Sequence, residues 1–278
     1  KAYFFLGASE GYMGIIEYGG GHYLSALING LRADNHLEEA LRLDPELTDA
    51  YLGLGIYRYG NTRLGGLVNF FMQGGKDMRL EGLNNIKRAL NSNALARPLA
   101  MKILIWFYIA EEINPQNDGL PADDPLSFKQ CRRRVLELLR RYEAAYFENA
   151  PPGFVGNKGL AMMKAIQFVL DRDYALARTE FQRVLTIIRR LRSAKGFQIN
   201  PKLTDTVTEG IKFCDLMLAS IRPAAANPRD SDCAKIKQQI AFIEGGGSMV
   251  EYESSKIRGE IQNVFYNRLK EVFAHNSC

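Results

Sequence analysis

Histidine, cysteine and the signatures of common catalytic sites are scarce in this 278-residue chain. It contains three histidines and four cysteines, and no two cysteines form a CxxC pair. It has no G-x-S-x-G nucleophile elbow and no G-x-x-x-x-G-K-S/T phosphate loop. His22, His36 and His275 include no i, i+4 pair of the kind that binds zinc on a helix. These absences argue against the commonest motif-defined enzymes and metalloproteins, so we expect no catalytic residue, cofactor or metal.

A long hydrophobic run and strand-like alternation are also missing. The longest apolar run covers residues 103–110, well short of the ~20 residues that span a bilayer. We interpret it as a buried helix with Trp106 in the core. No segment alternates apolar and polar residues over the length of a strand, whereas helical periodicity recurs throughout. The sequence therefore predicts an all-α fold.

The helical periodicity, punctuated by Gly, Pro and Asn, places the individual helices. Pro125 follows two aspartates that can cap a helix beginning there. One stripe of this helix is apolar and consists of Phe128, Cys131, Val135, Leu138, Tyr142 and Ala145. The glycine-rich apolar insert at residues 60–75 is expected to fold as a short helix tucked under the scaffold, with an exposed apolar tip as the alternative. The predicted helices cover residues 2–17, 22–43, 47–59, 76–91, 95–113, 125–148, 157–171, 173–194, 203–221, 231–244 and 248–273.

Small and large apolar residues recur at fixed spacing in the first half of the chain. They match signature positions of the 34-residue tetratricopeptide (TPR) unit, in the order Ala33, Leu37, Ala40, Pro45, Tyr51, Leu54 and Gly55. Weaker copies are Gly82, Ile86 and Ala89, and then Ala165, Phe168, Ala177, Phe181 and Val184. We predict TPR-like antiparallel helical hairpins stacked into a right-handed superhelix. One solenoid covers residues 1–278, and the loop at 114–124 allows a subdivision into 1–115 and 125–278.

One segment carries a more specific likeness. Residues 50–60 read Ala-Tyr-Leu-Gly-Leu-Gly-Ile-Tyr-Arg-Tyr-Gly, and after the apolar insert come Gly-Gly-Lys-Asp at 74–77 and Gly82-Leu83. This order resembles a group of bacterial TPR proteins that are mostly exported and, more distantly, the eukaryotic Iml2 and TTC39 group. The likeness covers about residues 20–115. It implies an all-α repeat fold without catalysis, and it transfers no catalytic motif to residues of this chain.

The sequence leaves more than one cellular compartment as an alternative. The chain begins at Lys1 inside an apolar pattern, so we expect that an N-terminal segment has been removed. A lost export signal or anchor favours the bacterial periplasm or the outer membrane, with the cytoplasm as the alternative. Cys131 is expected to be a small core residue. A disulfide between Cys214 and Cys233 is one alternative for an exported protein.

Positive charge is concentrated in one part of the chain. Residues 129–195 contain fifteen Lys and Arg against six Asp and Glu. If neighbouring helices display these residues on one side, the surface attracts an acidic peptide, a nucleic acid or an anionic lipid. The alternative is that basic side chains only coat the outer faces of amphipathic helices.

The sequence thus favours a non-catalytic scaffold that binds a segment of another protein on its concave surface. Nucleic acid is not the expected partner, and membrane contact would come through the missing anchor. The alternative function is a small-molecule or lipid-binding module with an apolar pocket in the tyrosine-rich N-terminal half. The candidate partner-binding residues are Tyr57, Asn61, Arg63, Asn84, Asn85, Arg88, Arg132, Arg133, Arg140 and Arg141.

Overall fold

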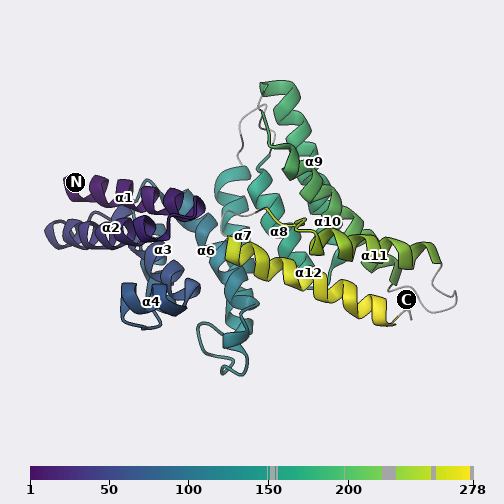
Figure 1. Cartoon of the computed structure of the whole chain (residues 1–278). Helices are drawn as coiled ribbons and strands as arrows, with labels where there is room; N and C mark the ends of the chain where they lie inside the picture. The colour runs from purple at the N-terminus through teal and green to yellow at the C-terminus, as the bar shows by residue number, and fades with distance from the viewer. Residues whose placement is uncertain are drawn as a thin grey trace. The chain divides into compact units, whose positions relative to one another are not determined.

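A computed structural model describes residues 1–148, 150, 154, 156–196, 198–220, 230–251 and 255–275. These residues form helices and no strand, which confirms the predicted all-α class. None of their helices combines the length and the hydropathy of a membrane span. The helices of Figure 1 are α1 (Ala2–Gly19), α2 (Tyr23–Leu43), α3 (Asp49–Leu64), α4 (Gly66–Gln73), α5 (Arg79–Leu90), α6 (Arg97–Glu112), η1 (Pro115–Asn117), α7 (Phe128–Phe147), α8 (Lys158–Leu170), α9 (Tyr174–Lys195), α10 (Pro201–Ser220), α11 (Asp230–Glu244) and α12 (Ser255–His275).

The chain divides into two compact units. The first contains residues 1–108 and 120–130, and the second contains residues 109–119 and 131–278. In the first unit α1 pairs with α2, α3 pairs with α5, and α2 also packs on α3. In the second unit α8 pairs with α9, α10 packs on α9, and α11 pairs with α12. Each unit is therefore built from helices packed in pairs.

The core of the first unit lies between its helical pairs. Ala33, Leu37 and Ala40 are almost fully buried on α2, and Leu37 belongs to a cluster with residues of α3. Tyr59 is fully buried, stacks on Phe107 at a centroid distance of 3.8 Å and donates its hydroxyl hydrogen to the Phe107 carbonyl oxygen. The Tyr59 ring therefore fills the space between α3 and α6 and is not available to a partner.

The core of the second unit forms where α9, α10 and α12 carry aromatic residues. Phe181, Phe213 and Phe265 are fully buried, and the last two rings lie 4.6 Å apart. Gly210 on α10 lets the Phe181 ring approach, since a Cβ atom there would lie 2.8 Å from its Cζ atom. A residue without a side chain is thus needed for α10 to pack on α9.

The predicted start of the helix at Pro125 is wrong, because α7 begins at Phe128. The Asp124 carboxylate accepts a hydrogen bond from the Leu126 N–H, and the Ser127 hydroxyl accepts one from the Gln130 N–H. Ser127 therefore caps the helix, and Pro125 belongs to the preceding turn. On the predicted stripe, Cys131, Val135, Leu138 and Tyr142 are buried as expected, whereas Phe128 and Ala145 are exposed.

The insert differs from the prediction in its boundaries. Helix α3 continues through Gly60 to Leu64, where we expected irregular structure from residue 60. Gly60 has open space around it, so the helix bears only the cost of about 1 kcal/mol for an interior glycine. The short helix expected in the insert is α4, and Phe70 on it is 62% exposed. Most of the other large side chains of the insert are outside the described set, so their burial stays a prediction.

The last helix also starts later than predicted, at Ser255 rather than at residue 248. The Met249 N–H donates to the side-chain oxygen of Gln262 on α12, at 2.8 Å, so the segment before the helix folds back along it. Met249 and Val250 are buried. The segments between the predicted helices at residues 149–156 and 222–230 lie partly outside the described residues.

Two predictions about buried residues are confirmed, and one alternative raised for the cysteines is excluded. Trp106 and Cys131 are buried core residues, as expected. Cys214 is a free, buried thiol while Cys233 is disulfide-bonded, so the considered bond between the two does not exist. Cys278 lies outside the described residues.

Candidate functional site

Six of the predicted partner-binding residues lie in the first unit, and they differ widely in exposure. Asn61 and Arg63 on α3 are buried, with 8% and 7% of their surface exposed. Tyr57 and Asn85 are half-buried, and burial raises the pKa of the Tyr57 hydroxyl. Only Asn84 and Arg88, both on α5, are exposed.

Arg88 is already engaged within the protein. Its guanidinium carbon lies 4.0 Å from the centre of the Tyr51 ring, a cation–π contact between α5 and α3. A partner that used Arg88 would first have to break this contact. In the first unit the predicted residues therefore do not make a single accessible polar surface.

An ion-pair cluster that the sequence did not reveal joins α2, α3 and α5. Arg58 on α3 pairs with Glu38 on α2 and Glu81 on α5, and its Nε atom lies 3.9 Å from Asp34 on α2. Burial raises the pKa of Asp34 to about 6, against the opposing effect of the Arg58 charge. One cation thus holds three carboxylates from two other helices. The cluster links the two helical pairs of this unit.

The four predicted arginines on α7 fall into two classes. Arg132 pairs with Asp171 at 2.5 Å, which raises the pKa of its guanidinium through the hydrogen bond. Arg133, Arg140 and Arg141 are exposed, and none of them forms an ion pair with any described residue. Three positive charges of α7 are therefore available to a partner, while Arg132 is used inside the unit.

An open pocket lies beside these arginines, between α7 and α8. Its volume is about 260 Å³. Leucine and phenylalanine side chains supply its apolar surface, and one arginine, one glutamate, one lysine and one glutamine supply the polar part. The lining residues are Leu136, Leu139, Arg140, Glu143, Lys164, Gln167 and Phe168.

The polar wall of this pocket is a connected network. Lys164 lies 3.2 Å from both Glu143 on α7 and Glu180 on α9, and Arg183 also approaches these two glutamates. Both carboxylates are thus matched by cations of the same unit. Arg140 is the lining cation that lacks an acidic partner among the described residues.

Gln167 connects the pocket to a buried carboxyl group. It is 1% exposed, and its Nε2 atom donates to Glu112 at 3.2 Å and to Asp171 at 3.4 Å. Burial raises the pKa of Glu112 to about 8. One oxygen of Glu112 and the Gln167 side-chain oxygen are buried without a hydrogen-bond partner. Glu112 is therefore held neutral near pH 7, in an environment that disfavours a carboxylate.

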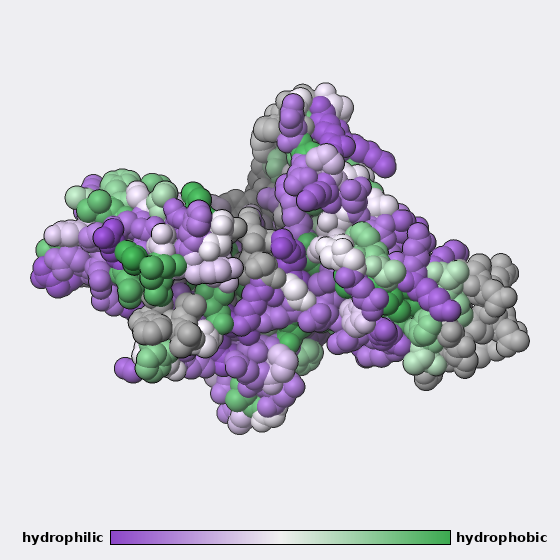
Figure 2. Space-filling view, in the orientation of Figure 1, coloured by the Kyte–Doolittle hydropathy of each residue, from purple (hydrophilic) through white to green (hydrophobic). Residues whose placement is uncertain are grey.

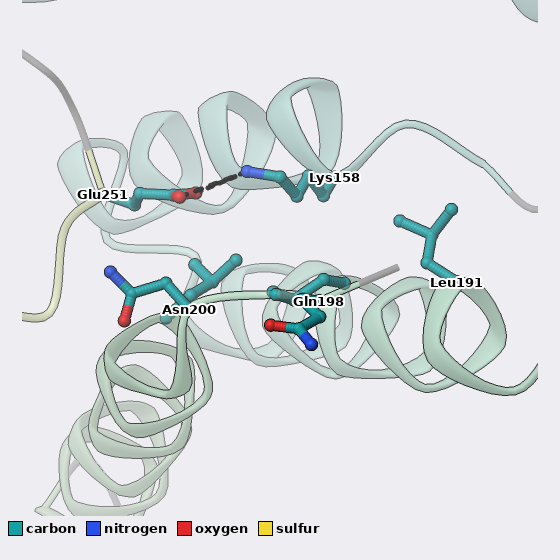
Figure 3. Close-up of a pocket in the computed structure, with 7 residues that line it drawn as sticks. Lys158, Leu191, Gln198, Asn200 and Glu251 are labelled. Carbon is teal, nitrogen blue, oxygen red and sulfur yellow. Dashed lines mark hydrogen bonds and ion pairs between the residues drawn. The ribbon is translucent and has the colours of Figure 1, made fainter. Parts of the chain in front are cut away.

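A larger pocket of about 400 Å³ lies elsewhere in the second unit. Figure 3 shows Lys158 joined to Glu251 along one side of it, at 3.1 Å, with Gln198, Asn200 and Leu191 around the rest. Ile199 and Leu203 complete the lining. The charges of Lys158 and Glu251 neutralise each other. The rest of the pocket lining consists of apolar side chains and the amide side chains of Gln198 and Asn200.

The outer face of α1 in the first unit is hydrophobic. Phe5, Tyr12, Ile15 and Ile16 are each 61–74% exposed. Hydrophobic surface gathers over this helix in Figure 2. Leu6 and Met13 add to it, each nearly half exposed. Such a contiguous exposed apolar surface marks an interaction site more often than a solvent-facing helix.

The described side chains include no group of three or more His, Cys, Asp or Glu residues that could hold a metal ion. No protein-family model, no curated protein and no solved structure matches this chain.

Proposed function

We propose that this protein is a non-catalytic, TPR-like helical scaffold that binds an acidic, amphipathic helical segment of another protein along α7 and its pocket. The observation that carries the proposal is a set of three exposed arginines on α7 that have no acidic partner among the described residues, of which Arg140 lines an apolar pocket.

Residues at repeat-signature positions support the scaffold part of the proposal. Ala33, Leu37 and Ala40 are buried between helices, as a TPR unit requires. Gly55 and Gly82, also at signature positions, let α3 and α5 touch through their backbones. In repeat scaffolds of this kind, side chains that are not used between helices form extended binding surfaces.

The chemistry of the α7 pocket favours an acidic partner with an apolar stripe. A carboxylate can pair with Arg140, and with Arg133 or Arg141 beside it, while Leu or Phe side chains fill the space against Leu136 and Leu139. Because Glu143, the acidic residue of the pocket lining, already pairs with Lys164, a basic partner finds no unmatched carboxylate in that lining. Charge selects the partner, and burial of apolar surface supplies most of the affinity.

The proposal is tested with two labelled peptides that share a helical leucine stripe and carry either Glu or Lys on its flanks. We expect the Glu peptide to bind the wild-type protein, with an affinity that falls as salt rises, and the Lys peptide not to bind. Arg140→Glu should weaken binding of the Glu peptide at least about tenfold, which corresponds to about 1.4 kcal/mol. Lys202→Glu, which reverses an exposed charge on α10, is the matched control and should leave binding unchanged. Equal binding of both peptides, or an unaffected Arg140→Glu variant, would contradict the proposal.

Small-molecule binding is the second candidate, and the 400 Å³ pocket of Figure 3 favours it. This volume is within the range of known ligand sites, and the pocket offers apolar surface with two amide side chains. It lies in the second unit rather than in the tyrosine-rich first half. A fragment screen by ligand-observed NMR tests it, with Leu191→Trp as the variant that fills the pocket. Fragments that bind the wild type and not the variant would support this function.

A further inference from the structure

Helix α1 has its charged residues on the side that faces α2. Its only charged residues are Glu10 and Glu17. The Glu10 carboxylate lies 2.7 Å from Nδ1 of His36, and the Glu17 carboxylate lies 2.7 Å from Nδ1 of His22. An ordinary surface helix places its charges toward solvent and its apolar residues inward. This helix has the opposite arrangement.

Glycines explain why the apolar residues cannot turn inward. A Cβ atom on Gly7 would lie 2.8 Å from Cγ of Leu37 and 3.0 Å from the Ala33 carbonyl oxygen. A Cβ atom on Gly14 would lie 3.3 Å from the Ala26 carbonyl oxygen. The two helices therefore pack with too little space for a large side chain. If α1 rotated about its axis, aromatic or branched side chains would take the place of these glycines at the contact with α2. The two helices would then be forced apart.

The outward residues form a regular seam. Phe5, Ser9, Tyr12 and Ile16 are spaced 4, 3 and 4 residues apart, which is the spacing of a helix that packs lengthwise against another helix. All four are exposed. Leu6 and Met13 lie on one flank of the seam and Ile15 on the other, and all three are exposed. The apolar face of α1 is therefore wider than the seam, so a helix packed along the seam also covers side chains on both flanks.

We propose that a second copy of this chain covers this seam, through an antiparallel contact between the two α1 helices. In that arrangement Phe5 lies opposite Ile16 of the other copy, and small Ser9 lies opposite the large ring of Tyr12. The seam is therefore complementary to itself, as a two-fold contact requires. No charged residue lies on it, so bringing two copies together creates no like-charge repulsion.

A lipid surface fits the seam less well. Helices that lie on membranes carry Lys and Arg on their polar face, where they meet anionic headgroups. Helix α1 contains no Lys or Arg, and its two carboxylates are engaged with His36 of α2 and with His22, which immediately precedes α2. The proposed contact is separate from the α7 pocket of the second unit, so either proposal can fail without the other.

Sedimentation velocity over a concentration series tests the contact. We expect the wild type to shift from one chain mass, 31.3 kDa, to twice that mass as concentration rises through the micromolar range. Tyr12→Glu should remain monomeric at every concentration, since it would place two carboxylates in the seam. Leu95→Glu is the matched control, because Leu95 is a 92% exposed residue of the same unit outside the seam, and it should dimerise like the wild type. Circular dichroism of each variant verifies that it is folded.

Disulfide trapping tests the register. A mixture of the single variants Phe5→Cys and Ile16→Cys should form a mixed disulfide dimer, and neither variant alone should do so. In an antiparallel pair, two copies of residue 5 are about 16 Å apart, at 1.5 Å of rise per residue. A wild type that stays monomeric throughout would overturn the proposal, as would a dimer that Tyr12→Glu leaves intact. A monomer that binds neutral phosphatidylcholine vesicles would assign the seam to a lipid surface instead.

Discussion

Gly55 and Gly82 bring the backbones of α3 and α5 into direct contact. A Cβ atom on Gly82 would lie 2.7 Å from the Gly55 carbonyl oxygen, and one on Gly55 would lie 2.6 Å from the Gly82 carbonyl oxygen. Both obstacles are backbone atoms, which cannot rotate away as a side chain can. The pairing of these helices therefore depends on the absence of a side chain at both positions.

Gly82→Ala is expected to destabilise the first unit by about 1–3 kcal/mol, the usual cost of overpacking. Gly60→Ala is the matched control, because it lies inside α3 with open space around it. At position 60 the substitution of glycine by alanine should stabilise the folded protein by about 0.5–1 kcal/mol, because only the helix propensity of the residue changes. Urea unfolding of both variants measures the two effects, and equal shifts of the midpoint would contradict the described contact.

Arg58→Met is expected to destabilise the first unit by about 1–3 kcal/mol at pH 7, because three carboxylates lose their common cation. Arg58 lowers the pKa of Asp34, so its removal should raise that pKa further above about 6. The loss should shrink as the pH falls through about 6 and Asp34 becomes neutral. Arg42→Met is the control, since Arg42 pairs with Glu39 in solvent and such pairs contribute little. An equal effect of both variants in urea unfolding would argue against the cluster.

Glu112→Gln is expected to flatten part of the pH dependence of stability. The pKa of Glu112 is raised from 4.5 to about 8 in the folded state by burial, so folding favours the neutral carboxyl group. The neutral Glu112 carboxyl group therefore stabilises the folded state fully below pH 4.5, and this stabilisation is lost as the pH rises through 8. The variant should therefore match the wild type near pH 5 and exceed it at pH 9 by several kcal/mol, at about 1.4 kcal/mol per pKa unit.

The measurement is urea unfolding at pH 5, 7 and 9, together with an NMR titration of the Glu112 carboxyl carbon. Glu137→Gln serves as the control, because Glu137 is half-buried and pairs with Arg134 near the surface. It should track the wild type at all three pH values. Titration of Glu112 near pH 4.5 would show that its surroundings are more solvated than described.

Cys131 and Cys214 are expected to resist alkylation in the folded protein. Both are fully buried, and burial raises the pKa of the Cys214 thiol to about 12, which suppresses the reactive thiolate. At pH 8 we expect iodoacetamide to modify them at least about a thousandfold more slowly than a free thiol, and rapidly in denaturant. Peptide mass spectrometry follows each site. Comparable rates in the folded and unfolded protein would contradict the buried position of these residues.

Residues whose role is local were predictable from the sequence. The buried stripe of α7 and the burial of Trp106 follow from periodicity and from an apolar run within one helix. The start of α7 was misplaced because two hydrogen bonds of Asp124 and Ser127 decide it, and Pro125 fits either a helix start or a turn.

Residues whose role depends on distant partners were not predictable. Nothing near Arg58 in sequence indicates Glu38 or Glu81, which come from other helices. Gln167 and Glu112 are 55 positions apart in the sequence, yet their side chains are hydrogen-bonded. The candidate site was found only in part, because exposed arginines on α7 can be inferred from charge, whereas burial of Asn61 and Arg63 depends on how the helices pack.

Selection from a displayed library of random peptides tests the central claim most directly, with the wild type compared against Arg133→Glu/Arg140→Glu/Arg141→Glu. The matched bait, Arg32→Glu/Lys76→Glu/Lys202→Glu, reverses three exposed charges elsewhere. We predict that the wild type and the matched bait enrich peptides combining Asp or Glu with Leu or Phe at helical spacing, and that the α7 variant enriches none of them. Enrichment of the same peptides by all three proteins, or of no peptides by the wild type, would contradict the assignment of α7 as the partner-binding surface.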